Sequence, residues 1–295
     1  MYKEIDSNKR RTYLLISIFL ILIIGIGWAL SYIYNDYFIL VIAVFVAVIQ
    51  SWVSYFYSDK IVLAMSKAHG PIKKKDNPEL YRIVENLSIA SGLPMPKVYI
   101  ISDSAPNAFA TGRNPDHAVI AVTTGLLDKL EKVELEGVIA HEMSHIGNYD
   151  ILLQTVVVTL VGAIVLASDF LLRSMFFRRR DSRGGGALAL IGLALLILSP
   201  IFAKLLQLSI SRRREYLADA SGALLTRYPE GLARALEKIS ADREILEASN
   251  RATAHLYIVN PLKKQAQGSS RMSELFSTHP PIQKRVEKLR EMLVK

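Results

Sequence analysis

Four apolar blocks dominate the pattern of hydrophobic and polar positions along the chain. Residues 13–34, 37–57 and 151–168 contain no charged side chain, and residues 184–203 contain none before Lys204. A helix needs about 20 apolar residues to cross a bilayer, so the first two blocks are predicted membrane spans and the last two are close to the minimum length. For this second pair, a buried core helix is the alternative interpretation.

The first two blocks are joined only by Asn35 and Asp36, so we expect them to form a helical hairpin. The first apolar run is too long for a secretory signal, and no small-residue cleavage site closes it, which favours a retained anchor. Basic residues gather at both outer ends of this hairpin: Lys3, Lys9, Arg10 and Arg11 before it, and Lys60, Lys67 and residues 73–75 after it. The positive-inside rule places that side in the cytoplasm, which predicts a multi-pass protein of the cell membrane.

The remaining regions show shorter periodic patterns. Apolar residues three and four positions apart predict amphipathic helices, and short runs rich in Val, Ile, Tyr and Thr predict strands. The predicted helices are 78–90, 133–147, 211–227, 229–240 and 281–295, and the predicted strands are 97–101, 107–111 and 118–124. We expect a small antiparallel sheet and an irregular stretch over residues 250–277. The chain then divides into a membrane hairpin (1–58), a part with the sheet (59–150), a second apolar hairpin (151–210) and a carboxy-terminal part (211–295).

Composition and charge narrow the range of functions. The formal net charge is +9, and much of it lies beside the predicted spans, where membrane topology accounts for it. Basic and aromatic residues are not interleaved, so we expect no nucleic-acid partner. The sequence has no cysteine, which excludes disulfides and thiolate metal ligands and fits a reducing compartment.

Residues 141–145 read His-Glu-Met-Ser-His inside a predicted helix. Side chains four positions apart share a helix face, so His141 and His145 can bind one metal ion while Glu142 points toward a water molecule beside it. This H-E-x-x-H spacing is typical of zinc metalloproteases, in which the glutamate is the catalytic base. Two surface histidines on an amphipathic helix are the alternative. The pattern predicts one Zn²⁺ per chain and peptide-bond hydrolysis.

A catalytic zinc ion has three protein ligands, so a third one must lie elsewhere in the chain. No histidine follows at the spacing of the H-E-x-x-H-x-x-G-x-x-H pattern, which leaves a carboxylate from another helix. From His145 to residue 175 is 30 residues, and from residue 187 to Glu215 is 28. Two antiparallel helices of about 45 and 42 Å would therefore return Glu215 to His145.

Asp219 follows Glu215 by one helical turn and is expected to orient a histidine ligand. Asp219 and Asp150 are the next candidates for the third ligand. In the alternative interpretation, Glu215 and Asp219 are a solvated pair that answers the basic residues 212–214.

Taken in order, these features resemble the HtpX-type integral-membrane zinc metalloproteases, relatives of the CAAX-prenyl-processing proteases. The resemblance covers nearly the whole chain and includes residues 107–110 (Asn-Ala-Phe-Ala), 141–145, 215–219 and 278–281 (Thr-His-Pro-Pro) with Arg285. It implies a mostly α membrane protein with four apolar helical segments and a gluzincin-like α+β protease domain. It implies zinc bound by His141, His145 and Glu215, while the positive-inside rule predicts that this active site faces the cytoplasm.

The same resemblance implies protein or peptide substrates, including misfolded membrane proteins, and a role in quality control and stress response. CAAX-type relatives have more membrane spans than the four blocks seen here, which counts against that narrower assignment. Substrate identity and oligomeric state are not predicted.

Two further groups are candidates for the reaction. His279, and after it Arg285, is predicted to stabilise the oxyanion that develops on the substrate. Alternatively, Thr278 caps a helix that begins with two prolines, and His279 is only a junction residue. Asn107, Ala108, Phe109 and Ala110 are expected to form an edge strand that pairs with an extended substrate, or else an ordinary strand with Phe109 in the core.

Two other classes of protein are alternatives to the interpretation as a protease. A non-catalytic membrane scaffold or transporter subunit would place polar residues inside its spans, but the first two blocks contain no charged residue. A zinc-binding regulatory protein would not need Glu142, because a structural site is closed by four ligands. The hairpin 151–210 is expected to cross the bilayer, although five arginines in residues 173–183 oppose this under the positive-inside rule and would favour packing at the surface.

Overall fold

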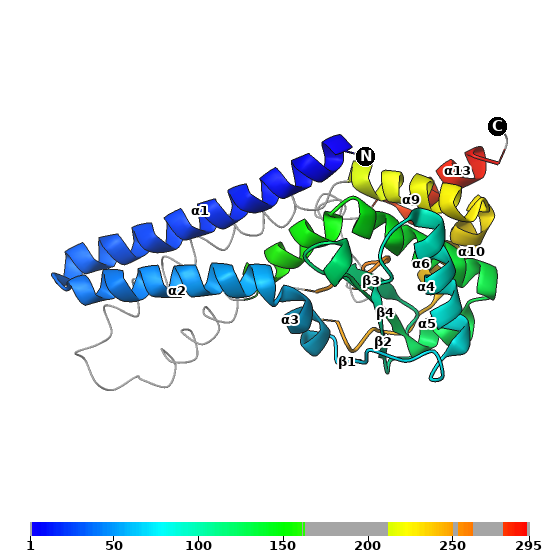
Figure 1. Ribbon diagram of the computed structural model, residues 1–295, viewed down its shortest axis with the longest axis horizontal. Helices are drawn as coiled ribbons and strands as arrows, with labels where there is room; N and C mark the ends of the chain where they lie inside the picture. The colour runs from blue at the N-terminus through cyan, green and yellow to red at the C-terminus, as the bar shows by residue number, and fades with distance from the viewer. Residues whose placement is uncertain (1, 161, 163–211, 250–252, 262–279, 294–295) are drawn as a thin grey trace.

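The computed structural model describes residues 2–160, 162, 212–249, 253–261 and 280–293. Its first two helices, α1 (Tyr2–Tyr34) and α2 (Tyr37–Phe56), form the predicted hairpin. They run side by side and extend away from the rest of the protein, with the connecting turn at the far end (Figure 1). The Asp36 carboxylate accepts a hydrogen bond from the Phe38 N–H at 2.9 Å and so caps α2 directly after the turn.

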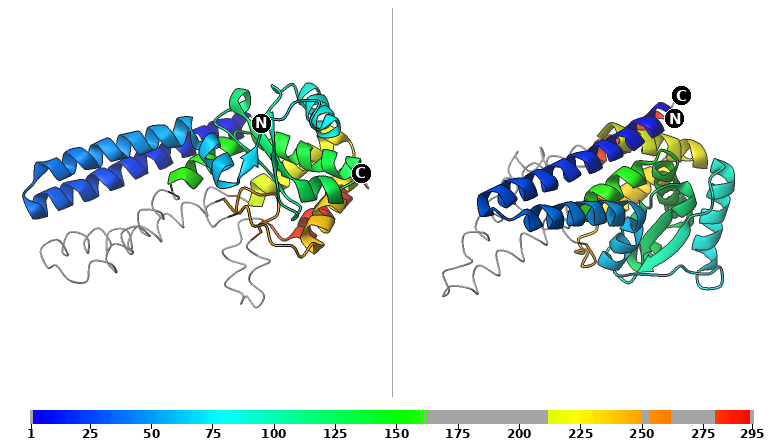
Figure 2. Two further views of the ribbon diagram at one scale, coloured as in Figure 1. Left: turned by 90° about the horizontal axis from the view of Figure 1, so that it is seen from below. Right: turned by 60° about the vertical axis from the view of Figure 1, so that its left-hand side comes forward.

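Both helices of the hairpin are long and apolar enough to cross a membrane. Only 17% of the apolar window of each is buried inside the protein, which is unlike a soluble core helix. In both views of Figure 2 the hairpin leaves the compact part of the protein on one side. Two apolar helices of this kind fit a location in a membrane.

The third apolar block is described only in part. Its beginning forms a shorter apolar helix over Asp150–Leu160, in which Leu152, Val156 and Leu160 pack with Phe19 of α1. Residues 163–211 lie outside the described residues, and with them the rest of this block and the whole fourth block. The described chain therefore contains two helices of spanning length and not the predicted four, and the crossing of hairpin 151–210 stays a prediction.

A four-stranded sheet in the order β1-β2-β4-β3 organises the compact part. Its strands are β1 (Ala68–His69), β2 (Lys97–Ile101), β3 (Ala108–Thr111) and β4 (Val119–Thr123). The predicted antiparallel sheet is wrong in one pairing, because β2 and β4 are parallel while the other two pairs are antiparallel. The physical reason is the place of β4: all five of its residues are buried, and it lies in the centre of the sheet. β3 takes the outer position, and β4 then folds back from β3 into the place between β3 and β2, so β4 runs in the same direction as β2.

Helices cover both faces of this sheet. One face packs on α4 (Pro78–Ser91), α6 (Lys132–Gly147) and α10 (Pro229–Ala241), with α9 (Arg212–Thr226) and α13 (Ile282–Glu291) completing this core. The other face packs on α3 (Ser58–Met65) and on Leu246 and Tyr257. The short helices η1 (Pro115–His117) and α5 (Thr124–Lys129) flank β4 in the chain.

Local signals set the ends of the helices that matter for the site. Asn77 caps α4 by accepting a hydrogen bond from the Leu80 N–H at 3.0 Å, and Gly92 ends it with a φ of 68°. Glu131 and Glu134 form a capping box at the start of α6. The capping box fixes the start of α6, the helix that carries residues 141–145.

α9 lies unusually close to α6. A Cβ added at Gly222 of α9 would lie 2.9 Å from the backbone nitrogen of His141, which is too close for any side chain. Glycine at this position therefore allows the two helices to meet at backbone distance, directly beside the histidine pair.

Candidate metal centre

His141 and His145 of α6 meet Glu215 of α9 in the interior of the protein. The Nε2 atoms of the two histidines are 3.2 Å apart. Glu215 Oε1 is 3.6 Å from His145 Nε2, and Glu215 Oε2 is 4.0 Å from His141 Nε2. All three side chains are buried, and they are the candidate metal-ligand group of the described residues.

The geometry and chemistry of this triangle fit a zinc ion. Zinc bonds of about 2.0–2.1 Å in a tetrahedral site put neighbouring ligand atoms about 3.3 Å apart. The separation of 3.2 Å between the two histidine nitrogens is close to that value, and the separations of 3.6 and 4.0 Å from the histidines to Glu215 are somewhat longer. Two imidazoles and one carboxylate are a donor set of catalytic zinc sites, which keep a fourth position for water.

Each histidine is held by its own aspartate through the other ring nitrogen. His141 Nδ1 lies 3.0 Å from Asp219 Oδ1, and His145 Nδ1 lies 2.9 Å from Asp150 Oδ2. In a neutral imidazole, an Nδ1–H that donates to a carboxylate leaves the lone pair on Nε2, so both Nε2 atoms face the metal position in the form that ligation requires. Asp219 thus lies behind His141, and Asp150 lies in the matching position behind His145, although the sequence suggested Asp150 only as a substitute ligand. The orienting role predicted for Asp219 stays a prediction.

Arg285 of α13 holds Asp219 in place. Its Nε and Nη2 donate to the two carboxylate oxygens at 2.8 and 2.6 Å, and its Nη1 donates to the Ile258 carbonyl at 3.1 Å. Burial opposes ionisation of Asp219, but the charge and hydrogen bonds of Arg285 outweigh it and lower the pKa of that carboxyl. Arg285 is fully buried, and its Nη1 is also 3.7 Å from Glu215 Oε2. Arg285 thus lies at the centre, as expected, where its contacts fit the positioning of Asp219. Its predicted role in stabilising the oxyanion stays a prediction.

Glu142 sits among these charges without being part of the triangle. Its side chain is buried, and burial raises the pKa of the carboxyl, while His141, His145 and the Ala110 N–H pull the other way. A carboxylate with a raised pKa is a better proton acceptor near neutral pH than an exposed one. Its environment therefore suits the predicted base.

The buried carboxylates around His145 make its imidazole more basic than an ordinary histidine. Burial lowers the pKa of His145, but the hydrogen bond to Asp150 and the charges of Glu215, Asp150 and Glu142 outweigh it and raise the pKa to about 9. In the metal-free protein, this imidazole is then protonated at neutral pH. A metal ion that binds at Nε2 takes the place of that proton.

The predicted substrate strand lies next to the centre but is occupied along part of its edge. The Ala108 carbonyl accepts a hydrogen bond from the Ile258 N–H at 3.0 Å, and Asn107 Nδ2 donates to the Val259 carbonyl at 2.8 Å. Phe109 is fully buried and packs edge-on against Tyr257, with ring centroids 5.0 Å apart. Phe109 is thus a core residue, and the backbone N–H of Ala110 in the same strand bonds to Glu142.

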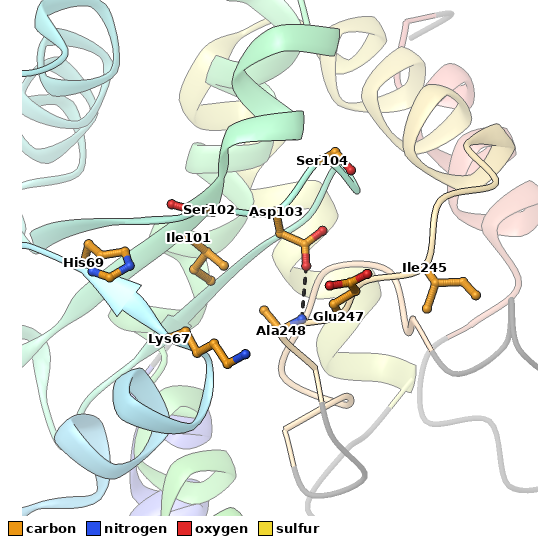
Figure 3. Close-up of a pocket in the computed structure, with 9 residues that line it drawn as sticks. All are labelled: Lys67, His69, Ile101, Ser102, Asp103, Ser104, Ile245, Glu247 and Ala248. Atoms are coloured by element: carbon orange, nitrogen blue, oxygen red, sulfur yellow. Dashed lines mark hydrogen bonds between the residues drawn. The ribbon is translucent and has the colours of Figure 1, made fainter.

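His279 lies outside the described residues, so its predicted role stays a prediction. A different polar hollow of about 330 Å³ opens at the carboxyl end of β2. Figure 3 shows its lining, in which Asp103 accepts a hydrogen bond from the Ala248 N–H at 3.0 Å. None of the metal-centre residues lines it. Its polar contacts tie the loop around Ala248 to the sheet.

The chain matches known proteins over almost its full length. The model of peptidase family M48 matches residues 74–293. A protein named protease HtpX homolog from Dictyoglomus thermophilum is 47% identical over 293 residues, which cover 99% of this chain and 94% of that protein. A protein of the same name from Tropheryma whipplei is 46% identical over 99% of this chain and 98% of its own length.

One solved structure has a related fold. The crystal structure of Ste24p from S. mikatae matches 94% of this chain with a TM-score of 0.50 and 22% sequence identity. This chain spans 65% of the length of that protein. At this level of identity the likeness concerns the fold alone.

Proposed function

Because this chain belongs to peptidase family M48 and is a metalloprotease of the HtpX type, we propose that it is a membrane-embedded zinc endopeptidase. The observation that carries the proposal is the buried triangle of His141, His145 and Glu215, with Glu142 beside it. Each ligand histidine is oriented by a separate carboxylate, which is how metal sites fix the tautomer and direction of imidazole ligands.

Each residue of the centre has a distinct role in the proposed hydrolysis. A zinc ion bound by this triangle would supply a Lewis acid that polarises the peptide carbonyl and makes a water molecule more acidic. Glu142 accepts the proton of the attacking water and passes it to the leaving amine. Asp219 and Asp150 keep His141 and His145 in the tautomer that ligation requires. The enclosed position of the centre keeps bulk water away from these charges and strengthens their interactions.

The membrane hairpin indicates where this chemistry takes place. Both ends of the hairpin meet the compact part of the protein (Figure 1), so the catalytic part lies on one side of a bilayer crossed by α1 and α2. The basic residues next to both helices support a cytoplasmic position of that side in the cell membrane. We propose protein substrates that reach this surface, misfolded membrane proteins among them, as in quality control and stress response.

A single substitution tests the catalytic assignment. Glu142→Gln removes the base and leaves all three ligands, so the detergent-purified variant should keep one zinc per chain and lose casein cleavage by about 10²- to 10⁴-fold. Glu136→Gln, the same change on the partly exposed side of α6, should leave both quantities unchanged. Full casein cleavage by Glu142→Gln, with zinc bound, would falsify the proposal.

A further inference from the structure

The amino-terminal membrane helix reaches the metal centre through one side chain. Asn8 lies in the second turn of α1, ahead of the apolar run, and is completely buried. Its Nδ2 donates to Asp150 Oδ1 at 2.8 Å and to the Asn148 carbonyl at 2.9 Å. Arg214 of α9 donates from Nη1 to Asn8 Oδ1 at 2.9 Å. Every polar atom of the amide is thus used in contacts with the segments that carry the ligands.

Asp150 is the point where these contacts meet the centre. One of its oxygens, Oδ2, faces His145 Nδ1 at 2.9 Å, and the other, Oδ1, faces Asn8 Nδ2 at 2.8 Å and Arg214 Nε at 3.5 Å. Arg214 directly precedes the ligand Glu215 in the chain. The amide of Asn8 therefore links the carboxylate behind one ligand to the residue beside another.

Burial makes this link strong. Asn8, Asp150, Arg214 and His145 have exposed fractions of 0, 1, 5 and 6%. A buried polar group that loses its partner costs about 1–3 kcal/mol, and more for a charged group. Without the Asn8 amide, Oδ1 of Asp150 would keep, among the described contacts, the more distant guanidinium, and the carboxylate would be held less firmly against His145.

We propose that Asn8 is a positioning residue for zinc: α1 is part of the metal centre as well as a membrane anchor, because Asn8 fixes Asp150 and Asp150 fixes His145. This inference rests on the proposed zinc site. A purely structural role for Asn8, the docking of α1 on the compact part, makes a different prediction. In that case, removing the Asn8 side chain would lower the stability of the fold by the same amount whether or not Asp150 is present.

A double-mutant cycle on the full-length protein in detergent separates the two roles. Zinc affinity is measured by competition with a zinc chelator for the parent, Asn8→Ala, Asp150→Ala and the double variant. The melting temperature in excess chelator reports the stability of each metal-free fold. Asn8→Leu, which keeps the branched shape of the side chain, is a second probe if Asn8→Ala is poorly folded. Thr12→Val is the matched control, because Thr12 is also fully buried on α1 and its hydroxyl, within the part of the chain that the structure describes, donates to the Asn8 carbonyl and not to Asp150.

The expected results are graded. Loss of an orienting partner of a ligand typically weakens metal binding about 10- to 100-fold, which we expect for Asp150→Ala. Asn8→Ala and Asn8→Leu should weaken it about 5- to 10-fold. Thr12→Val should leave it unchanged. In the Asp150→Ala background, Asn8→Ala should have no further effect, because the two residues act in series.

Two outcomes would overturn the inference. The first is parental zinc affinity in both Asn8 variants while Asp150→Ala is weakened. The second is an equal loss from Asn8→Ala with and without Asp150, which would show that α1 acts through the fold. Failure of the proposed function looks different: His145→Ala would then bind zinc as tightly as the parent protein.

Discussion

The two histidines of the centre differ in how firmly their aspartates are held. Asp219 receives two hydrogen bonds from the charged Arg285 at 2.6 and 2.8 Å. Asp150 receives one from a neutral amide at 2.8 Å, and its nearest guanidinium nitrogen is 3.5 Å away. Charge-assisted hydrogen bonds are about twice as strong as neutral ones. We therefore expect Asp219 to hold His141 more rigidly than Asp150 holds His145, because Asp150 is itself held by the neutral Asn8 amide.

Glu215 is predicted to be required for zinc binding, while Asp219 is predicted to raise the affinity for zinc. Glu215→Ala leaves two ligands and should abolish stoichiometric zinc binding. Asp219→Asn keeps an oxygen near His141 but loses the charge, and should weaken zinc binding about tenfold. Zinc content after dialysis against a zinc buffer measures both. A full complement of zinc in Glu215→Ala would move the third ligand to Asp219 or Asp150.

The centre could be predicted from the sequence wherever spacing carries the information. His141, Glu142 and His145 follow from helical periodicity, Glu215 from the length of the chain between the two helices, and Asp219 from one further helical turn. Asn8 has no such signal, because its contact with Asp150 spans 142 residues and depends on how α1 docks. Asp150 lies five residues after His145, and side chains five positions apart do not share a helix face. Asp150 meets His145 because α6 ends at Gly147 and the chain turns before Asp150, which the sequence pattern did not show.

At the scale of elements, the contact between α6 and α9 sets the distance between the ligands. Gly222 packs on the backbone of Ala140 and His141, so a methyl group there has no flexible neighbour to displace. Both helices must move apart, and Glu215 moves with α9.

Gly222→Ala is therefore predicted to lower stability and weaken zinc binding. Alanine gains about 1 kcal/mol of helix propensity over glycine. Overpacking costs about 1–3 kcal/mol, and it should outweigh that gain because the contacted atoms are backbone. Zinc affinity should fall about tenfold. Ser221→Ala, its partly exposed neighbour on α9, should be neutral in both measurements; a stabilised Gly222→Ala with parental zinc affinity would contradict the packing argument.

α13 brings Arg285 to the centre and is fastened to α10 by an ion cluster. Arg290 donates to Glu230 at 3.0 and 3.1 Å and to Glu237 at 2.9 and 3.0 Å. The hydrogen bonds from Arg290 lower the pKa of Glu230 from its ordinary value of 4.5. A lowered pKa in the folded state means that the contribution to stability is present above pH 4.5 and is lost as the pH falls through the lower, folded-state value.

Arg290→Gln should accordingly lower the melting temperature more at pH 7 than at pH 4. The effect should be modest, because the cluster is exposed and screened by solvent, and it should shrink in high salt. Arg243→Gln, an exposed arginine outside the cluster, is the control. A difference in melting temperature that grows toward acid pH would reverse the sign argued here.

The sheet shows which property of the strands could not be predicted from sequence patterns, namely the order in which they lie side by side. The positions of β2, β3 and β4 follow closely from runs of β-branched and apolar residues, but such runs do not state which strands are neighbours. The near-continuous apolar run of β4 was the available signal, since strands buried on both faces are typical of central positions. β1, with two residues, is defined only by its pairing with Ile100 and Ile101 and could not have been found alone.

At the scale of the whole molecule, the membrane hairpin fixes the side on which the catalytic part lies. The turn between α1 and α2 is at the far end of the hairpin, and both outer ends join the compact part (Figure 1). If the hairpin crosses the cell membrane as proposed, its turn and its basic flank face opposite compartments.

The cysteine-free sequence allows a direct test of this topology. Tyr37, at the start of α2, is 81% exposed, and Lys75 lies exposed in the segment before α4. Tyr37→Cys should react with a membrane-impermeant thiol reagent in intact cells, and Lys75→Cys should react only after lysis. The opposite labelling pattern would place the catalytic part outside the cytoplasm.

The distribution of the centre over the chain also has a consequence for the timing of synthesis. Asn8 and Arg214 are 206 residues apart, which at about 5–20 residues per second takes a ribosome about 10–40 s to translate. During that interval the growing chain already contains His141, Glu142 and His145, but Glu215 has not been made and Arg285 follows later still. A chain that ends before Glu215 has two of the three proposed zinc ligands, so we expect it to hold no catalytic zinc while it is being made. The order of residues along the chain therefore predicts that the centre is completed late in synthesis, long after α1 and α2 have been made.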